Sequence, residues 1–598
     1  MRKPLLAASF LALPTFAFAQ SAQVSEVIVT ATRLPAFVEE TPSVHVITRE
    51  DIENRQAVFA PDILNTVPGL SVFRNGAFGG PAGVQIRGAS ADKTLVLIDG
   101  VPMNDPSTPA GTYDFSGLDL ADVDRIEILS GPQGSIWGSD AIGGVIAFTT
   151  RELNGLSGSF EGGSLDTTRA TLAAGSANES RAFGISASGF STDGISAATN
   201  GTEPDGFTSW TGGVNGRIAA TQNLTLDGKL RYTAGDVQLD GYAPPFWTFG
   251  DTSDTAQNRT WSGYGRVKGE ALGLEHTLLY SGYQTERQNF GAYKARRNDW
   301  RWTSGKGDAA DPFAFLVGAE RDETRATVST GDVANLAETS AFAVARWRPV
   351  ERASVTASVR YDDPDKYASD TTARIAGSYE IGWGLTAAAS IGQGYKVPTI
   401  SQSVCDFCWM PALPLKAEKA EGYDVSLAWR SDDGRFKADV TGYRLAVSDQ
   451  IAYVGGTYVN ISRTLTTGVE TEARAEITDE LSVRAEYAYA DAVDRSTGAR
   501  LVRVPEHTGS ASLDWRGERL RGDLTVRAQG KQADADPDTF APTTRKGYVV
   551  ADLAGSYQLQ PGLELTARVE NIADRRYQQV LGYGEPGRTV YVGFRIRP

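Results

Sequence analysis

Alternation of apolar and polar residues over residues 154–598 restricts the fold more than any other feature. In the last segment Val590, Val592, Phe594 and Ile596 share one face of a strand, and polar or small residues occupy the other. Many such segments separated by turns are typical of strands that meet lipid on one face and a polar lumen on the other. The sequence therefore predicts a transmembrane β-barrel.

The size of the predicted barrel follows from the spacing of its turns. At about 20 residues per strand and connection, the segment holds roughly 22 antiparallel strands, although spacing alone also allows about 18 or 20. Ser176–Glu179 is a short turn, whereas Gly241–Asn258 and Tyr293–Ala319 are long, polar and aromatic. We expect those two segments to be outer loops, because bacterial barrels have short periplasmic turns and long outer loops.

The amino terminus carries the pattern of a secretory signal peptide. Arg2 and Lys3 precede an apolar run, and Ala17–Ala19 offers small residues for cleavage. We expect residues 1–19 to be removed. No later stretch is apolar for long enough to form a membrane-spanning helix. An exported chain of this kind is either soluble in the periplasm or a barrel, and the alternation favours the barrel.

Residues 125–150, RIEILSGPQGSIWGSDAIGGVIAFTT, read as a strand, a tight glycine turn and a second strand. A glycine-rich turn after a strand can bind nucleotide phosphates. However, a P-loop needs Lys and Ser or Thr after its last glycine, and a dinucleotide fold needs a helix there. A strand-forming stretch follows Gly144 instead, which argues against nucleotide binding.

This stretch resembles the plug-domain core of TonB-dependent outer-membrane receptors. Three further matches precede it in the family's order: DILNTVPGL at 62–70, VQIRG at 84–88 and LVLIDGVPMN at 95–104. The resemblance implies a globular α+β plug over residues 41–153 inside the lumen of the barrel. It also implies a monomeric importer without enzymatic activity, embedded in outer-membrane lipid and driven by the inner-membrane protein TonB.

The segment between the signal peptide and the plug, residues 20–40, contains a strand-forming stretch at 26–33. It is similar to the TonB box, which docks on TonB by adding a strand to its sheet. The residues concerned are Glu26, Val27, Ile28, Val29, Thr30, Ala31 and Thr32. No partner strand for it is evident in the adjacent sequence. The alternative is an ordinary first strand of the plug.

Within the plug, the sequence predicts a strand at 44–47, a helix capped by Thr48 and Asp51, and a second helix from Pro61 to the Pro68–Gly69 pair. Charges interrupt the other predicted strands. We expect them to pair with the polar barrel wall and to hold the plug without a dry core. They are Arg87, Asp99, Arg125, Glu127 and Arg151.

Two plug loops, 74–83 and 102–116, correspond to family loops that point outward and touch the ligand. Their candidate ligand-binding residues are Asn75, Asn104, Asp105, Thr108 and Tyr113. In the barrel loops the candidates are Tyr242 and Trp247. The alternative for each residue is a solvated turn.

Among the family's members, the chain most resembles the cobalamin receptors in size, plug sequence and one acidic loop, which implies a corrinoid ligand. Calcium binds six to eight oxygen atoms, which carboxylates on two adjacent loops can supply. The candidate calcium ligands are Asp193, Glu203, Asp205, Asp240 and Asp251. Here Glu203 stands where the family often has Asp, and solvated acidic loops are the alternative.

Other functions have less support. Haem capture through an imidazole is disfavoured, because His45, His276 and His507 are the chain's three histidines and are scattered. The same scarcity argues against a barrel enzyme, and a passive porin needs neither a plug nor a docking strand. A ferric siderophore remains an alternative ligand, with a pocket built from Tyr242, Trp247, Arg296, Arg297, Trp300 and Trp302.

Charge and cysteine content complete the expectations. The net charge of −15 argues against nucleic acid, which requires a basic surface. Cys405 and Cys408 are the two cysteines. In an oxidising compartment we expect a local disulfide across a loop, with a redox site or half of a zinc site as the alternatives.

Overall fold

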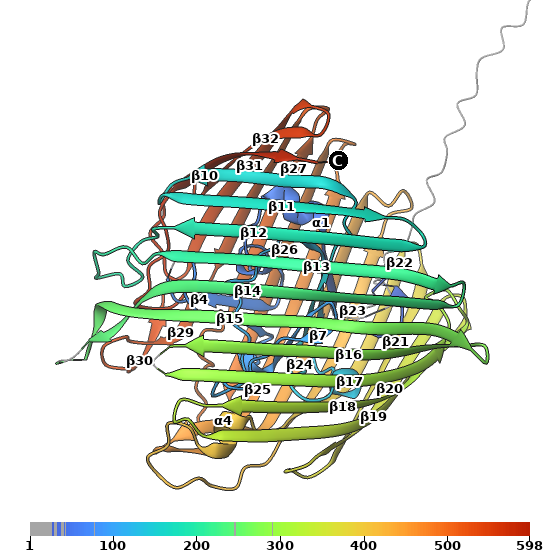
Figure 1. Cartoon of the computed structure of the whole chain (residues 1–598), viewed down its shortest axis with the longest axis horizontal. Helices are drawn as coiled ribbons and strands as arrows, with labels where there is room; N and C mark the ends of the chain where they lie inside the picture. Colours follow the sequence, from blue (N-terminus) through green and yellow to red (C-terminus); the bar gives the residue numbers. More distant parts are fainter. Residues whose placement is uncertain are drawn as a thin grey trace, which may run out of the picture.

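A computed structural model of the protein describes residues 27–28, 33–37, 41, 43–76, 78–243, 245, 247–289 and 291–597. The predicted signal peptide lies outside this range. The chain forms a closed antiparallel barrel of 22 strands with an amino-terminal α+β unit, the plug, inside it (Figure 1). This confirms the predicted fold class and strand number. None of the described helices is long and apolar enough to cross a membrane.

The barrel strands follow one another in sequence order, and β10 pairs with β33 to close the barrel. Their bounds are β10 Gly155–Gly163, β11 Thr167–Ala177, β12 Arg181–Thr192, β13 Phe207–Thr221, β14 Leu224–Ala243, β15 Thr248–Ala271, β16 Leu274–Gln288, β17 Ala292–Lys306, β18 Phe313–Thr327, β19 Val333–Val350, β20 Ala353–Pro364, β21 Asp370–Gly382, β22 Leu385–Lys396, β23 Glu418–Arg430, β24 Phe436–Val454, β25 Thr457–Glu476, β26 Leu481–Asp494, β27 His507–Arg516, β28 Leu520–Gln529, β31 Tyr548–Gln560, β32 Leu563–Glu570 and β33 Thr589–Ile596.

Alternation along β33 shows why these sequences form the wall. Val592 is 53% exposed on the lipid-facing side, whereas its neighbour Tyr591 is fully buried against the lumen. Large apolar side chains are similarly exposed along the other strands, including Leu172, Phe183 and Leu230. Exposed apolar residues at every second position form the outer band that a lipid bilayer requires.

The two ends of the barrel differ in the length of their connections. One end, the loop end, carries the connections 193–206, 397–417, 495–506, 530–547 and 571–588. The loops hold helix α4 (Ile400–Val404) and the hairpin of β29 (Gln532–Ala535) and β30 (Pro542–Arg545). At the opposite end, the turn end, the longest connection is 307–312. In outer-membrane barrels the long loops face outward.

The prediction of long loops at Gly241–Asn258 and Tyr293–Ala319 is wrong. The first segment lies mainly in β14 and β15, and the second forms parts of β17 and β18 around a six-residue turn at the turn end. β15 has 24 residues, although about 9–11 suffice to cross the membrane. These segments resemble loops because they are rich in polar residues, which in β15 belong to a strand much longer than the bilayer requires.

The plug has a five-stranded sheet of order β3-β8-β9-β6-β7 and a separate β4–β5 hairpin. Its elements are β3 Val44–Thr48, α1 Arg49–Arg55, α2 Ala60–Leu64, β4 Leu70–Arg74, β5 Ala82–Ile86, η2 Ala91–Lys93, β6 Thr94–Ile98, β7 Val101–Pro102, β8 Val123–Ser130, α3 Gly134–Trp137 and β9 Gly144–Thr150. Before it, β1 (Val27–Ile28) pairs with β2 (Ala36–Phe37).

The first two plug helices begin close to the positions that local sequence patterns predicted. Thr48 and Asp51 form the predicted capping box at the start of α1. α2 begins near Pro61 as expected but ends at Leu64, before Pro68. Between β8 and β9 the expected tight turn contains the one-turn helix α3, whose residues are all buried. Apolar residues of the sheet, of the β4–β5 hairpin and of α2 form the plug core, which includes Phe148, Val84 and Ile63.

Candidate functional site

A cavity of about 320 Å³ lies between the plug loops and the barrel wall. Asn289, at the β16–β17 connection, and Arg503, in the 495–506 connection, line it, so it reaches the loop end. Its volume is at the lower end of the ~300–1,000 Å³ typical of small-molecule pockets. A bulky ligand seated here would also extend toward the outer loops.

Four of the five predicted plug-loop residues line this cavity: Asn75, Asp105, Thr108 and Tyr113. Thr108 donates a hydrogen bond to the Asp105 carbonyl and accepts one from the Thr112 amide, which fixes the loop. Tyr113 packs edge-on against Phe115, and burial raises the pKa of its hydroxyl well above the ordinary range. Tyr113 therefore remains a neutral donor or acceptor.

The cavity also contains polar atoms without protein partners. Asn75 Oδ1, Asn289 Oδ1 and Arg287 Nη2 are buried and form no hydrogen bond with the described residues. A buried polar group costs free energy unless it is hydrogen-bonded, so these atoms require a ligand or water. Arg287 Nε also has no hydrogen-bond partner, so there are two acceptors and two donors, which suit a ligand that carries both kinds of group.

The arginines of the cavity are already engaged by carboxylates. Arg231 contacts both carboxylate oxygens of Asp122 through Nη1, Arg287 lies 3.6 Å from Asp105, and Arg503 lies 3.5 Å from Asp534. Their charges are therefore largely compensated. The cavity, whose lining combines apolar and polar side chains, therefore has no strong surplus of positive charge.

The remaining predicted ligand residues lie elsewhere. Asn104 is buried, and its side chain bonds the backbone of Thr94, Val96 and Gly111, so it positions the loop and does not face the cavity. The Tyr242 hydroxyl donates to the Pro537 carbonyl at 2.6 Å and fastens the β14–β15 connection to the 530–547 loop. Trp247 is exposed at the tip of the β14–β15 connection.

Three of the five predicted calcium ligands converge. Glu203, Asp205 and Asp240 each place a carboxylate oxygen within 4.8 Å of the others, and two of the three are buried. Among the described residues, no lysine or arginine forms an ion pair with them. Burial, together with the neighbouring Asp240, raises the pKa of Asp205 to about 7. This uncompensated negative charge fits a cation with oxygen ligands.

The other two residues surround this cluster without joining it. Asp251 accepts hydrogen bonds from the Thr202 amide at 2.8 Å and the Ser196 hydroxyl at 3.1 Å. The same hydroxyl lies 3.1 Å from Asp240 as an alternative acceptor, which links Asp251 to the cluster indirectly. Asp193 is exposed and lies outside the three-carboxylate group.

Ion pairs between plug and wall are numerous. Arg87 contacts Asp424 and Glu470, which lie on the wall. Further pairs join Arg74 to Glu585, Lys93 to Glu418, Asp99 to Lys229, Asp119 to Arg169 and Asp122 to Arg231. Arg125 pairs with Glu127 inside the plug, and Arg151 donates to Ser157. An apolar cluster of Val58, Phe59, Phe78, Phe190 and Phe207 adds contact between plug and wall.

In the stretch predicted to be the TonB box, Glu26, Val29, Thr30, Ala31 and Thr32 lie outside the described residues. Val27 and Ile28 form β1 and pair antiparallel with Phe37 and Ala36. The expectation of no partner strand nearby is therefore wrong. Arg33, at the end of the stretch, is buried against Glu320 at 3.1 Å and stacks over Trp137.

The residues considered for a siderophore pocket do not gather. Trp300 and Trp302 are about half exposed on the outer face of β17, where they meet lipid. Arg297 points inward and pairs with Asp322 at 2.7 Å. Cys405 and Cys408 form a disulfide after helix α4, in the 397–417 loop.

Wall residues that line the cavity were not identified from the sequence. They include Ser209, Gln257, Asn258, Arg231 and Arg287. Alternation distinguishes the two faces of each strand but does not show which positions lie level with the plug loops. That information resides in the register between strands and in plug contacts that are distant in sequence.

Comparisons with known proteins cover nearly the whole chain. The model of the "TonB dependent receptor-like, beta-barrel" family matches residues 147–572, and that of the "TonB-dependent Receptor Plug Domain" matches residues 38–145. The vitamin B12 transporter BtuB of Vibrio cholerae is 29% identical over 649 aligned positions, which cover 99% of each chain.

Solved structures show the same fold at lower identity. The siderophore receptor PirA of Acinetobacter baumannii has a TM-score of 0.80 at 17% identity, over 93% of this chain and 98% of PirA. A mutant of the ferric enterobactin receptor PfeA of Pseudomonas aeruginosa has a TM-score of 0.79 at 19% identity, with the same coverage of each chain. With its 22-stranded barrel, enclosed plug and the two family matches, the chain belongs to the TonB-dependent receptors of the outer membrane.

Proposed function

We propose that the protein imports a corrinoid across the outer membrane. The observation that carries this proposal is the alignment with the vitamin B12 transporter, which extends over 99% of both chains. Its identity of 29% exceeds the 17–19% found for the siderophore receptors, which favours a shared ligand class over a shared fold alone. The structural likeness to siderophore receptors, at 17–19% identity, shows a shared fold and does not identify the ligand.

The chemistry of the loop-end cavity supports a corrinoid. A corrinoid carries many amide groups around its ring, and amides both donate and accept hydrogen bonds. Asn75, Asn289 and Arg287 offer unpaired atoms of both kinds. A ferric siderophore complex that is anionic would instead favour uncompensated cations, and the cavity arginines are paired with carboxylates.

We further propose that Glu203, Asp205 and Asp240 hold a structural calcium ion. The cluster lies where the 193–206 loop meets the loop-end part of β14. Calcium there would neutralise the carboxylates and fix the loop beside the ligand's entrance. It would have no catalytic role.

Transport requires energy from the inner membrane, which reaches the receptor through TonB. In this proposal, ligand binding releases the 26–33 stretch, which adds a strand to TonB, and force on that segment remodels the plug. Many plug–wall contacts are ion pairs, and Glu470, the wall partner of Arg87, also lines a cavity of about 180 Å³. When force opens the plug, water can replace the partners of such charged groups. The protein acts as a receptor and transporter.

The test is a binding screen of the purified full-length protein in detergent. Cobalamin, cobinamide, haem and ferric siderophores are titrated with calcium and with a chelator, and uptake is followed in cells with and without TonB. We expect corrinoids to bind most tightly and to accumulate only with TonB. Tight binding of a ferric siderophore without corrinoid binding would contradict the proposed ligand.

A further inference from the structure

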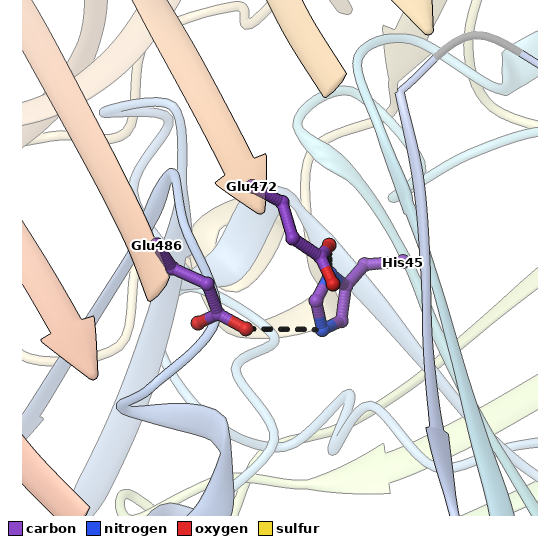
Figure 2. A group of neighbouring side chains, drawn as sticks. All are labelled: His45, Glu472 and Glu486. Carbon is purple, nitrogen blue, oxygen red and sulfur yellow. Dashed lines mark ion pairs between the residues drawn. The ribbon is translucent and has the colours of Figure 1, made fainter. Parts of the chain in front are cut away.

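His45 of the plug lies between two carboxylates of the barrel wall at the turn-end half of the lumen. Its Nδ1 is 3.1 Å from a Glu472 oxygen, and its Nε2 is 3.9 Å from Glu486 Oε1. Figure 2 shows Glu472 and Glu486 extending from neighbouring barrel strands toward the His45 ring. The three side chains are mostly buried, with Glu486 only 1% exposed.

At this position the wall presents two neighbouring carboxylates, which favour a positively charged group between them. Glu472 on β25 and Glu486 on β26 are direct cross-strand partners. Like charges directly opposite each other destabilise a strand pair, especially away from water. Glu486 Oε2 accepts from the Ser510 hydroxyl at 2.8 Å, but buried Oε1 has no hydrogen-bond partner among the described residues. A cation between the two carboxylates would resolve both problems.

The orientation of the ring favours a proton over a metal ion as the source of that charge. The two carboxylates approach different ring nitrogens. A metal ion binds one imidazole nitrogen and needs the carboxylates on that same side. An imidazolium instead carries a proton on both nitrogens, so it can donate to Glu472 at 3.1 Å and attract Glu486 across 3.9 Å.

We propose that His45 is a proton-operated clamp that fastens the edge strand β3 of the plug to barrel strands β25 and β26. In the clamp, the imidazolium of His45 bridges Glu472 and Glu486. When the ring loses its proton, one nitrogen stops donating, and the two carboxylates repel each other across a neutral ring. The clamp then opens, and β3 loses this link to β25 and β26.

The position of β3 gives the clamp a mechanical role. β3 lies at the edge of the plug sheet and pairs only with β8, so its other edge faces the wall. It is also the plug strand nearest in sequence to the 26–33 stretch. Tension from that side reaches β3 before any other strand of the sheet. A closed clamp would therefore resist the first step of plug remodelling.

Other charged groups around β3 must be considered with the clamp. Burial alone would lower the pKa of His45, but contact with Glu472 and Glu486 overcomes this effect and raises it, with Arg484 opposing the rise. Arg484 lies 3.7 Å from Glu472 and 3.5 Å from Asp51 of α1. Further charges on neighbouring elements are Arg49, Glu50, Glu53 and Arg55 on α1, Arg125 and Glu127 on β8, Arg430 on β23, Lys437 and Asp439 on β24, Glu470 and Arg474 on β25, and Asp514 on β27.

The direction of the pH effect follows from the raised pKa. The clamp's contribution is fully present below the ordinary histidine pKa of 6.5 and is lost as the pH rises through the higher folded-state value. A cavity of about 180 Å³ lined by His45, Arg430 and Lys437 lies beside the clamp. Arg430 ends β23 beside the 431–435 turn, so this cavity lies toward the turn end, which faces the periplasm.

Two measurements on the full-length protein in detergent test the clamp. With three histidines in the chain, nitrogen-15 labelling of histidine allows the His45 ring to be titrated beside exposed His507 as an internal control. Amide exchange, corrected for intrinsic rates, reports the opening of β3. We expect a His45 pKa above 6.5 and a loss of β3 protection of about tenfold or more between pH 6 and pH 9.

Substitutions separate the clamp from general stability. His45→Lys keeps a cation and should preserve β3 protection at both pH values, whereas His45→Gln should lower protection at both. His507→Gln should leave the β3 profile unchanged. A His45 pKa at or below 6.5 in the wild type, or β3 protection independent of pH, would overturn the proposal even if the His45 variants fail to fold. So would binding of one Zn²⁺ per chain that His45→Gln abolishes, because it would identify a metal site.

Discussion

Arg87 of the plug and Glu470 of the barrel wall form a two-point ion pair, with Nε and Nη2 2.9 and 2.7 Å from the two carboxylate oxygens. The same guanidinium contacts Asp424 and donates to Ser43 at 2.9 Å. Arg87 is 2% exposed. One side chain thus joins a plug strand end to barrel strands β23 and β25.

Replacing Arg87 with Met should loosen the plug severely. The change leaves Asp424 and Glu470 buried without their cation, and breaking a buried pair in this way costs about 3–5 kcal/mol. The free energy of plug unfolding, measured by denaturant titration within the intact barrel, should fall by that amount. Arg259→Met is the matched control, because its partner Asp236 is exposed and such pairs contribute about 0–1 kcal/mol. Equal effects of the two substitutions would contradict the role of Arg87.

Adding Asp424→Asn and Glu470→Gln to Arg87→Met should restore part of the lost stability. The triple variant has no buried unpaired carboxylate at this site, so the desolvation penalty largely disappears. If the triple variant is no more stable than Arg87→Met, packing of the Arg87 side chain against Tyr443 would explain the loss instead.

Calcium affinity should depend on pH through Asp205. Its pKa is raised to about 7 by burial and by Asp240, so below pH 7 calcium must displace a proton. Without the cation, the folded loop loses stability as the pH rises from about 4 to 7, because the folded state holds that proton more tightly than the unfolded state. Titration calorimetry should show affinity rising up to about tenfold per pH unit below 7 and levelling above it.

Removing the Asp205 carboxylate should reproduce chelation. In Asp205→Ala, corrinoid affinity with calcium present should fall to the value that the wild type shows with a chelator. Asp193→Ala is the matched control, since Asp193 is an exposed carboxylate on the same loop and lies outside the cluster. If corrinoid affinity is unchanged after both chelation and Asp205→Ala, these carboxylates are solvated acidic residues without a calcium ion that supports binding.

The sequence predicted the barrel and the plug better than their mutual arrangement. Alternation along β33 and the capping box at Thr48 are local signals, and both appear in the structure. The expectation that Arg87 meets the wall was also correct. Its partners Asp424 and Glu470 are 337 and 383 residues away, and no local rule links positions so distant.

Where the prediction failed, the local signal was weak or ambiguous. Ala36–Phe37, the partner of Val27–Ile28, is too short to stand out as a strand. The loop-end parts of β15 and β17 resemble loops because polar residues dominate them. Asn104 has the composition of a loop ligand, yet its three backbone hydrogen bonds make it a fixed part of the plug.

Substitution of Ile28 by Pro should abolish uptake without weakening surface binding. Proline removes a backbone donor, and strand addition to TonB depends on such donors. Ile28→Val keeps the donor and the β-branched side chain, so it should retain uptake. Uptake by energised cells and ligand binding to the same cells at low temperature give the two readouts. Wild-type uptake by Ile28→Pro would discredit the docking role of this stretch.

Filling the loop-end cavity from the wall tests whether it receives the ligand. Ser209 is a buried, lumen-facing residue of β13 and lines the cavity, whereas its neighbour Thr208 is exposed on the lipid side. Ser209→Trp places an indole in the space, so ligand affinity should fall by about tenfold or more, or ~1.4 kcal/mol. Thr208→Trp adds the same side chain outside and should bind as the wild type does. Equal ligand affinities for both variants, measured by titration of the folded protein, would show that the ligand binds outside this cavity.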